Sequence, residues 1–598
     1  MCGIYCTNKT FDFHKVKSKM NNIKSRGPDN QQILFVDDLI LAHNRLSIID
    51  LDKRSNQPMK YANLTIVFNG EIYNFNELKN QLINKNYNFS TNSDTEVIMA
   101  MYLEYGKDCI KYFNGMFSFV IYDSPNRKLF IARDRVGQKP LYYFHRNNKI
   151  ELCSQISQFE KKDLKISEES IYAFFKYKYI PEPLSIYDNI KKFPAGSFAY
   201  YDIDNSELEI QSYWSLPSNL INTDYLDIKK NLSELIKSSV GYRMISDVPI
   251  GVFLSGGIDS SLIASYAQKQ SSKPIKTFCI KFDEFNHDES LYAKKISNYL
   301  GTNHTTIECD KDEIKKFIMN FNSAFDEPFA DSSALPSLLL SEKTKKHVTV
   351  ALSGDGGDES FLGYNRYDFF NNYSFIFNLP HKIRLLISKI LNLSGNEKIK
   401  IISEILGSKN SRFFYGKIIQ VLNQKYFHGN LSDSFFNHDE VLFQSNDIFT
   451  DISRFDIKTY LCDDINVKVD RSSMFSSLES RSPFLDFRVL EYANSIPVKY
   501  RFSNGNKKKI LKDILLDEMP KKYFDRPKSG FKIPLDNWFR TYLKDWILDN
   551  LNDKNLKLIP NLNIDVSKKM IQNHLNNKVD KSNEIWKLMV MVNWLKNN

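Results

Sequence analysis

Short apolar or alternating segments, separated by clusters of turn residues, dominate the first 200 residues of the chain. Such segments predict β-strands, and they fall at residues 39–41, 64–68, 117–122, 128–132 and 141–144. Helical periodicity at residues 76–84 and 94–105 interrupts them. We therefore predict an α+β domain in which layered strands outnumber helices.

The pattern changes near Asp224, where long helical periods alternate with short apolar segments at 248–254, 275–280 and 347–352. Strands that alternate with helices predict a parallel α/β sheet. Beyond Phe369 the pattern is almost wholly helical, and we expect the stretch 373–455 to pack around the second domain. A polar stretch with Pro217 separates the two textures, so we predict domains at 2–205 and 224–598, joined by a linker at 206–223.

Length and composition fit this division, because 598 residues exceed what one hydrophobic core supports. The sequence contains neither an apolar run of about 18 residues nor a basic-then-apolar leader, so we expect a cytoplasmic protein without a membrane partner. Seven scattered cysteines form neither a disulfide framework nor a zinc pattern.

The formal charge of +10 arises from 81 basic and 71 acidic side chains spread along the whole chain. Without a dense basic block this excess does not predict a nucleic-acid partner. It can attract anionic small molecules such as ATP.

The chain opens with Met1-Cys2-Gly3-Ile4. Removal of Met1 would make Cys2 the N-terminus, where an α-amine with a pKa of about 7.7–8.0 could accept the thiol proton. The resulting thiolate is the form that attacks carbonyl carbon. Because a cysteine can follow any start codon by chance, this observation needs support from the rest of the sequence.

Support comes from polar motifs at 25–29, 43–50, 68–74 and 93–96. The Asn69 amide and the Gly70 N–H could stabilise an oxyanion. Arg45 could bind the carboxylate of a free amino acid, and Glu71 and Asp94 its ammonium. Taken singly, each has an ordinary structural explanation: a hairpin turn for Asn69-Gly70, a helix cap for Asp94, a surface position for Arg45.

Together with residues 114–117 and 132–143, these motifs resemble the glutaminase domain of the class II amidotransferases. These N-terminal-nucleophile hydrolases release ammonia from glutamine, and the resemblance implies an αββα sandwich. It implies that Cys2 is the nucleophile, that Asn69 and Gly70 form the oxyanion hole, and that glutamine is held by Arg45, Leu46, Ser47, Ile48, Ile49, Asn69, Gly70, Glu71 and Asp94. Ser25 replaces a histidine that many relatives carry, at a position that the chemistry does not use.

In the second half, the apolar segment 252–254 leads into Ser255-Gly256-Gly257-Ile258-Asp259-Ser260-Ser261 and a helical pattern. A strand, a tight turn and a helix N-terminus together form a phosphate-binding geometry. A glycine turn with a Ser/Asp cap is the simpler explanation. The motif lacks the lysine of the common P-loop and resembles the pyrophosphate loop of the ATP pyrophosphatases.

A second loop of the same design, residues 353–359, follows the apolar segment 348–352. Mg²⁺ prefers carboxylate and phosphate oxygens, so we predict Asp259 and Asp358 as its ligands. Acidic side chains clustered without a cation would repel one another. Asp355 is a candidate for orienting or deprotonating an incoming amine.

With the motifs at 246–249, 326–328, 363–367, 468–471 and 479–486, the whole pattern resembles the asparagine synthetase family. The resemblance implies a charge-stabilising role for Lys528 on the ATP phosphates. It implies ATP contacts from Leu254, Ser255, Gly256, Gly257, Asp259, Ser260, Ile280, Ser353 and Gly354. Asp355 stands where some members carry glutamate, and Phe361-Leu362-Gly363 replaces the more usual Phe-Gly-Gly.

The family chemistry implies substrates glutamine, aspartate and ATP with Mg²⁺, and an aspartyl adenylate that ammonia converts to asparagine. Three alternatives remain: another acceptor carboxylate such as a uronic acid sugar, a β-lactam-forming activity, or a non-catalytic binding protein. The β-lactam-forming relatives lack the N-terminal cysteine, and a binding protein would be expected to lose site residues. The sequence decides neither the acceptor nor whether the chain forms a homodimer.

Overall fold

The computed structural model describes residues 2–282, 289–394, 397–420, 426–428, 445, 447–503, 505–525 and 533–598. The N-terminal half contains two six-stranded antiparallel sheets, in the orders β10-β8-β9-β1-β3-β2 and β12-β11-β7-β6-β5-β4. The strands are β1 (Gly3–Thr7), β2 (Asn30–Val36), β3 (Leu39–Arg45), β4 (Met59–Tyr61), β5 (Leu64–Ile72), β6 (Gly115–Asp123), β7 (Lys128–Arg133), β8 (Tyr142–Arg146), β9 (Lys149–Cys153), β10 (Lys191–Lys192), β11 (Ser197–Asp202) and β12 (Glu207–Ser212). Every strand segment predicted in this half is confirmed.

The two sheets pack face to face through fully buried side chains. Ile4 and Leu41 of the first sheet meet Val67, Val120 and Ile131 of the second. Helices cover the outer faces and complete an αββα sandwich; they are α1 (Phe13–Asn21), α2 (Phe75–Ile83), α3 (Asp94–Tyr105), α4 (Cys109–Tyr112) and α5 (Glu168–Tyr177). The predicted helices at 76–84 and 94–105 correspond to α2 and α3.

β12 corrects the predicted linker. It lies inside residues 206–223 and pairs with β11, so its six residues belong to the second sheet. Leu208 and Ile210 alternate with glutamates and pack against the core between the sheets. This alternation was the overlooked signal; the remaining domain limits stay predictions.

The second half is built on a five-stranded parallel sheet in the order β15-β14-β13-β16-β17. Its strands are β13 (Ile250–Phe253), β14 (Lys276–Phe282), β15 (Asn303–Cys309), β16 (Val350–Leu352) and β17 (Glu479–Arg481). Helices α6 (Tyr225–Arg243), α7 (Ile258–Lys269), α8 (Ser290–Leu300), α9 (Lys311–Met319), α10 (Phe321–Ala324), α11 (Ala334–Lys345) and α12 (Gly357–Ser360) accompany it. The predicted α/β character is therefore confirmed.

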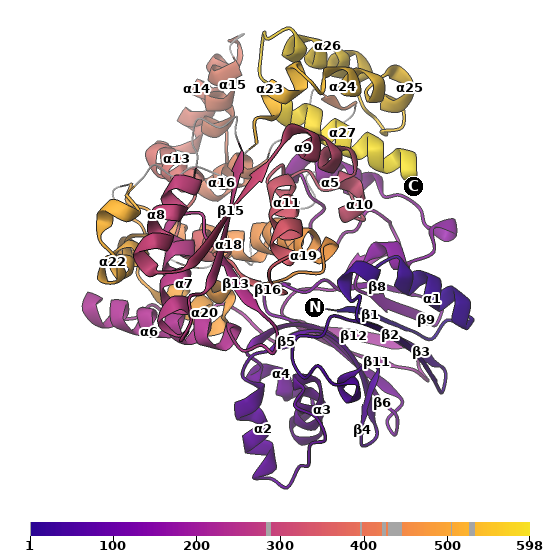
Figure 1. Ribbon diagram of the computed structural model, residues 1–598. Coiled ribbons are helices and arrows are strands. Elements are labelled where there is room, and N and C mark those ends of the chain that lie inside the picture. The colour runs from indigo at the N-terminus through magenta and orange to yellow at the C-terminus, as the bar shows by residue number, and fades with distance from the viewer. Residues whose placement is uncertain are drawn as a thin grey trace.

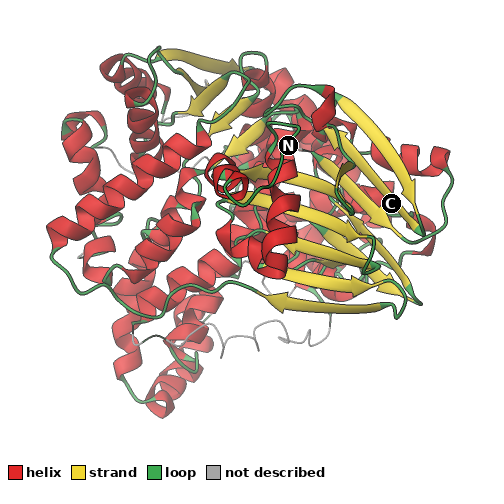
Figure 2. Ribbon diagram, turned by 90° about the horizontal axis from the view of Figure 1, so that it is seen from below, coloured by secondary structure: helices red, strands yellow, loops and turns green. Residues whose placement is uncertain are grey.

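The rest of the described chain is helical, as expected, except for β17. The helices are α13 (Asn365–Ser374), α14 (His381–Asn392), α15 (Glu397–Leu406), α16 (Ser411–Ile419), α18 (Ile448–Lys458), α19 (Asn466–Phe475), α20 (Phe487–Ser495), α21 (Val498–Arg501), α22 (Lys509–Glu518), α23 (Leu535–Arg540), α24 (Lys544–Asn550), α25 (Asp553–Leu556), α26 (Ile564–Leu575) and α27 (Ser582–Asn597). Figure 1 shows the N-terminal sheets below and the helical region above, and Figure 2 shows most strands on the right, a few more at the top, and helices on the left. Within the described ranges, no helix has the length and apolar character needed to cross a membrane.

Buried polar contacts join the two halves. The Arg26 guanidinium donates two hydrogen bonds to the Asp470 carboxylate, at 2.7 and 2.9 Å. Asn114 Nδ2 donates to Asp486 Oδ2 at 2.9 Å. Because a buried charge is costly unless it is paired, these contacts favour one relative placement of the halves.

Candidate active sites

Cys2 lies buried at the start of β1, beside strand β5 of the facing sheet. Its backbone N–H donates to Asn69 Oδ1 at 3.0 Å. Burial raises the pKa of the Cys2 thiol, whereas the positive amino terminus, the Leu46 backbone and Arg45 act in the opposite direction. A base or cation close to the thiol would therefore strongly affect its reactivity.

Asn69 and Gly70 stand inside β5, not in a hairpin turn. Among the described residues, Asn69 Nδ2 is buried without a hydrogen-bond partner, which is rare for a polar atom and suits a donor that awaits an oxyanion. A Cβ atom at Gly70 would lie 2.0 Å from the Met116 carbonyl oxygen. Only glycine allows β6 to approach this position so closely.

Two buried carboxylates lie near Cys2. Burial raises the pKa of Asp94 to about 6, although its Oδ2 accepts a hydrogen bond from the Ile72 N–H at 2.9 Å. Burial, Glu479 and Asp94 raise the pKa of Glu71, whose Oε2 finds no hydrogen-bond partner in the part of the chain that the structure describes. An ammonium group bound there would supply the missing positive charge. Asp94 is not the cap of α3, because Ser93 takes that position.

Arg45 ends β3 and is buried, not on the surface. Its guanidinium donates to the Asp52 carbonyl at 2.9 Å and to Asn56 Oδ1 at 2.8 Å, and also to the Ile49 and Asp50 carbonyls. These acceptors are neutral, so the positive charge remains available to a substrate carboxylate. Of the segment that follows, Leu46 and Ile48 are buried, and Ser47 N donates to Asp29 Oδ2 at 2.8 Å.

The second site lies where the parallel sheet ends. β13 and β16 are neighbours, so the loops that follow them meet at the same edge, where α/β proteins commonly bind ligands. Ser255, Gly256 and Gly257 form the turn after β13, and Asp259 and Ser260 occupy the first turn of α7. Leu254 and Ile280 are buried beneath the turn and Gly256 has a φ of 76°, a backbone conformation that favours glycine.

Asp259 and Asp358 converge on the ammonium group of Lys508. Lys508 Nζ lies 2.6 Å from Asp358 Oδ1 and also pairs with Asp259 Oδ2. Burial alone would lower the pKa of Lys508, but the two carboxylates outweigh it and raise that pKa. A Cβ at Gly363 would meet Asp358 Oδ1 at 2.0 Å and Lys508 Cε at 2.1 Å, so any other residue would displace this ion pair.

The predicted Mg²⁺ ligands are therefore together, but with a lysine between them. Across the described ranges, no cluster of three or more His, Cys, Asp or Glu side chains could hold a metal ion. Two convergent carboxylates nevertheless fit Mg²⁺, which usually takes one or two carboxylates and completes its shell with phosphate and water oxygens. Lys528 lies outside the described residues.

Asp355 faces the junction between the halves. It lines a small cavity of about 20 Å³ with Met116, Gln138 and Lys139 of the N-terminal half. Ser353 contributes to the same lining, while a Cβ at Gly354 would lie 3.0 Å from that of Asp259. Burial raises the pKa of Asp355, and the positive charge of Lys468 lowers it.

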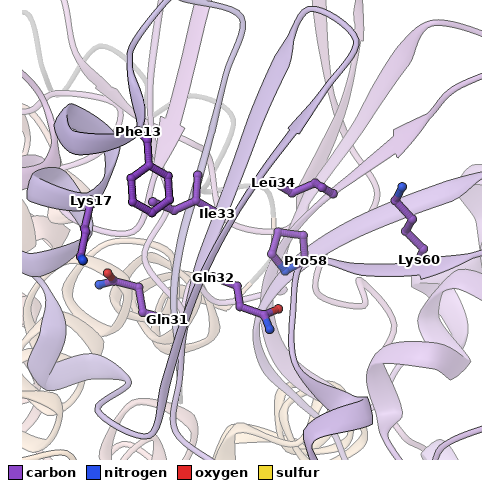
Figure 3. Close-up of a pocket in the computed structure, with 8 residues that line it drawn as sticks. All are labelled: Phe13, Lys17, Gln31, Gln32, Ile33, Leu34, Pro58 and Lys60. Carbon is purple, nitrogen blue, oxygen red and sulfur yellow. The ribbon is translucent and has the colours of Figure 1, made fainter.

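A larger surface hollow of about 510 Å³ lies elsewhere. Figure 3 shows its lining from α1, β2 and the segment around β4: Phe13, Lys17, Gln31, Gln32, Ile33, Leu34, Pro58 and Lys60. None of the predicted site residues that the structure describes lines it. It is therefore separate from both candidate sites.

Comparison with known proteins agrees with this two-site arrangement. A family model for asparagine synthase matches residues 231–596, and a model for a glutamine amidotransferase domain matches residues 1–214. The chain belongs to the asparagine synthase family. The resemblance inferred from the motifs is thus confirmed, and both parts of a glutamine-dependent ligase are present in one chain.

Relatives match over most of their length. The glutamine-hydrolyzing asparagine synthetase 1 of Bacillus subtilis is 30% identical, over 99% of this chain and 96% of that protein. A putative asparagine synthetase 2 of Methanocaldococcus jannaschii is 35% identical, over 80% of this chain and 98% of that protein. Amidase chry2 of Gibberella zeae is 25% identical, over 88% and 85% respectively.

Three residues of this asparagine synthase family member were not singled out from the sequence. Lys508 stands between the two aspartates, although only a run of three lysines marks it in the sequence. Glu479 and Arg481 of β17 reach the N-terminal site: Arg481 Nε donates to Glu479 Oε1 at 2.6 Å, and its Nη2 lies 3.7 Å from Glu71 Oε1. No local pattern indicates that Glu71 meets residues about 400 positions away.

The departure at residue 362 also has a structural explanation. Leu362 adopts a φ of 56°, in the left-handed region that favours glycine. Its side chain is fully buried against Tyr367 and Phe370. Burial therefore offsets the cost of about 1 kcal/mol that a side chain incurs in this conformation.

Proposed function

We propose that this chain is a glutamine-dependent asparagine synthetase. It hydrolyses glutamine to ammonia, adenylates aspartate with ATP and amidates the adenylate to asparagine. One observation carries the proposal. A single chain of the asparagine synthase family contains both Cys2, beside an Asn69 Nδ2 that has no partner among the described residues, and the Asp259–Lys508–Asp358 cluster.

In the first half-reaction, loss of Met1 leaves an amine on Cys2 that accepts the thiol proton. The Cys2 thiolate attacks the carboxamide carbon of glutamine, and Asn69 Nδ2 and Gly70 N–H donate to the oxyanion. The intermediate then expels ammonia, which takes the proton held by the amine. Water hydrolyses the thioester to glutamate and regenerates the thiol. Arg45 pairs with the substrate carboxylate, and Glu71 and Asp94 pair with its ammonium.

In the second half-reaction, the backbone N–H groups before α7 bind the pyrophosphate part of ATP. The Lys508 ammonium neutralises charge that develops as the aspartate carboxylate attacks the α-phosphorus and pyrophosphate leaves. Asp259 and Asp358 would hold Mg²⁺, which supplies further phosphate neutralisation when bound.

Ammonia then attacks the acyl carbon of the adenylate, and AMP leaves. Asp355 orients ammonia or accepts its proton, because a buried carboxyl with a raised pKa is suited to proton transfer. The cavity shared by Met116, Lys139 and Asp355 supports transfer of ammonia between the halves.

A second candidate keeps this chemistry but amidates another carboxylate, such as a uronic acid sugar. The observation that favours retaining it is that family relatives of this chain include a protein named as an amidase, chry2.

Pyrophosphate release by the purified full chain separates the two candidates. We expect release with ATP, Mg²⁺ and aspartate, and asparagine after addition of glutamine. Release with a uronic acid sugar but not with aspartate would overturn the first candidate in favour of the second.

A further inference from the structure

Helices α14 and α15 form a hairpin in the helical region, remote from the N-terminal sheets (Figure 1). Polar side chains hold the two helices together. Ser388 Oγ donates to the Ser403 carbonyl, and Ser403 Oγ donates to the Ser388 carbonyl, both at 2.7 Å. Arg384 is 3% exposed and donates to the Leu406 carbonyl at 3.0 Å. The polar face of α14 is therefore turned inward.

The opposite face of α14 is aliphatic. Ile383, Leu386, Ile390 and Leu393 recur at intervals of three or four residues and so share one face, which we call the α14 stripe. They are 49%, 63%, 62% and 88% exposed, respectively. A helix in water normally turns this face inward, and contiguous exposed apolar residues mark an interaction site.

The charges beside the α14 stripe indicate its partner. Lys382 and Lys389 are exposed and border the stripe on the same side of the helix. Between His381 and Asn392 the sequence contains three basic residues and no Asp or Glu. In a second copy of the chain, α14 would offer these lysines no counter-charge, whereas anionic lipid head groups would.

We propose that α14 is an interfacial helix that docks the protein on an anionic lipid bilayer. The α14 stripe enters the boundary between head groups and acyl chains, and Lys382 and Lys389 contact lipid phosphates. The expectation of no membrane partner rested on spanning segments alone, and such a helix lies in the membrane plane. The proposal is independent of the acceptor carboxylate.

Co-sedimentation of the full chain with lipid vesicles tests the proposal. We expect binding to phosphatidylcholine vesicles that contain phosphatidylglycerol, and weaker binding to pure phosphatidylcholine or at high salt. Leu386→Gln/Ile390→Gln should weaken binding to the anionic vesicles about 10- to 100-fold. Lys382→Ser/Lys389→Ser should weaken it about 10-fold and remove most of the salt dependence.

Leu226→Gln/Leu548→Gln is the matched control, because both leucines are exposed apolar residues on other helices. It should bind vesicles like the wild type, and every variant should retain ATP-dependent pyrophosphate release as evidence of folding. No sedimentation with anionic vesicles, or equal binding by Leu386→Gln/Ile390→Gln, would overturn the proposal. A wild-type dimer that this variant splits, without vesicle binding, would instead assign the α14 stripe to a second copy.

Discussion

The two candidate sites differ in how their buried carboxylates are paired with positive charge. Near Cys2, Glu71 and Asp94 have raised pKa values because burial and mutual repulsion outweigh the positive charge nearby. At the edge of the parallel sheet, Asp259 and Asp358 enclose the ammonium of Lys508. At the first site the positive charge of Arg481 is outweighed at Glu71, so a substrate ammonium would add stabilising charge there, whereas the second site already places a lysine ammonium between its two carboxylates.

This contrast follows from the substrates that the two sites are proposed to bind. Glutamine carries an ammonium that can complete the Glu71–Asp94 pair, whereas ATP brings only negative charge to the Lys508 site. The sites nevertheless meet at β17. The Arg481 side chain approaches Glu71 of the first site, and the Arg481 carbonyl accepts a hydrogen bond of 2.9 Å from the Ser353 N–H of the second. One three-residue strand thus contacts both.

The largest expected effect is the loss of glutamine-dependent activity without loss of ammonia-dependent activity. Cys2→Ala should reduce glutamine-dependent asparagine formation at least about 1,000-fold, since no other nucleophile replaces the thiolate. Synthesis from ammonium chloride should persist, as measured by asparagine formation with each nitrogen source. Cys6→Ala, which removes a buried thiol of the same strand, should retain both activities. Glutamine use by Cys2→Ala would contradict the assignment.

Removal of the built-in cation should stop the second site with either nitrogen source. We expect Lys508→Met to lower ATP-dependent pyrophosphate release about 100-fold or more, because Asp259 and Asp358 then face the phosphates without Lys508. Lys507→Met, which loses contacts with Asn365 and Asp368 away from the two aspartates, is the control. Full activity of Lys508→Met at saturating Mg²⁺ would show that Lys508 only stabilises the apo site.

Glu71→Gln should act on the first site alone. Loss of one carboxylate from the ammonium site should raise the KM for glutamine about 10- to 100-fold, while ammonia-dependent synthesis stays unchanged. Steady-state kinetics with both nitrogen sources measure this difference. A proportional loss of both activities would instead point to a structural role at the junction with Arg481.

The pH dependence of glutamine use tests the role of Asp94 at the first site. Because the pKa of Asp94 is raised to about 6, its carboxyl becomes neutral as the pH falls through that value and no longer attracts the substrate ammonium. kcat/KM for glutamine should then fall about tenfold per pH unit below the inflection. Asp94→Asn should lower kcat/KM and remove this inflection. An unchanged inflection in that variant would assign the titration to another group.

The predictability of the two sites differed for physical reasons. Cys2, Asn69, Gly70 and the Ser255–Ser261 loop belong to short motifs, and the family resemblance of these motifs suggested which residues act together. The local pattern predicted the strand, turn and helix around Ser255–Ser261, but it missed β1 and ended the strand before Asn69, which lies inside β5. β17 was missed because Glu-Ser-Arg contains no apolar residue, and its burial depends on charge pairing across the domain junction. Lys508 was missed because its partners come from distant loops.

In the helical region the sequence showed an apolar face but not the direction in which that face points. The aliphatic period of α14 is visible in the sequence, but a periodic apolar face ordinarily predicts burial. Only the structure shows that Arg384 is buried and that Ser388 bonds to α15, while Leu386 and Ile390 face outward. The amphipathic pattern was therefore readable, but not its orientation.

The smallest effect is expected at Ser25, the departure from the family pattern that precedes Arg26. Ser25 is exposed, and its carbonyl accepts a hydrogen bond from Ser477 Oγ at 2.6 Å, a contact that a new side chain leaves intact. Ser25→His should therefore change kcat/KM for glutamine by no more than about twofold, as surface substitutions usually do. A larger gain in glutamine use would show that this position influences Cys2 through the adjacent Arg26, whose Nε donates to the Cys2 carbonyl at 3.0 Å.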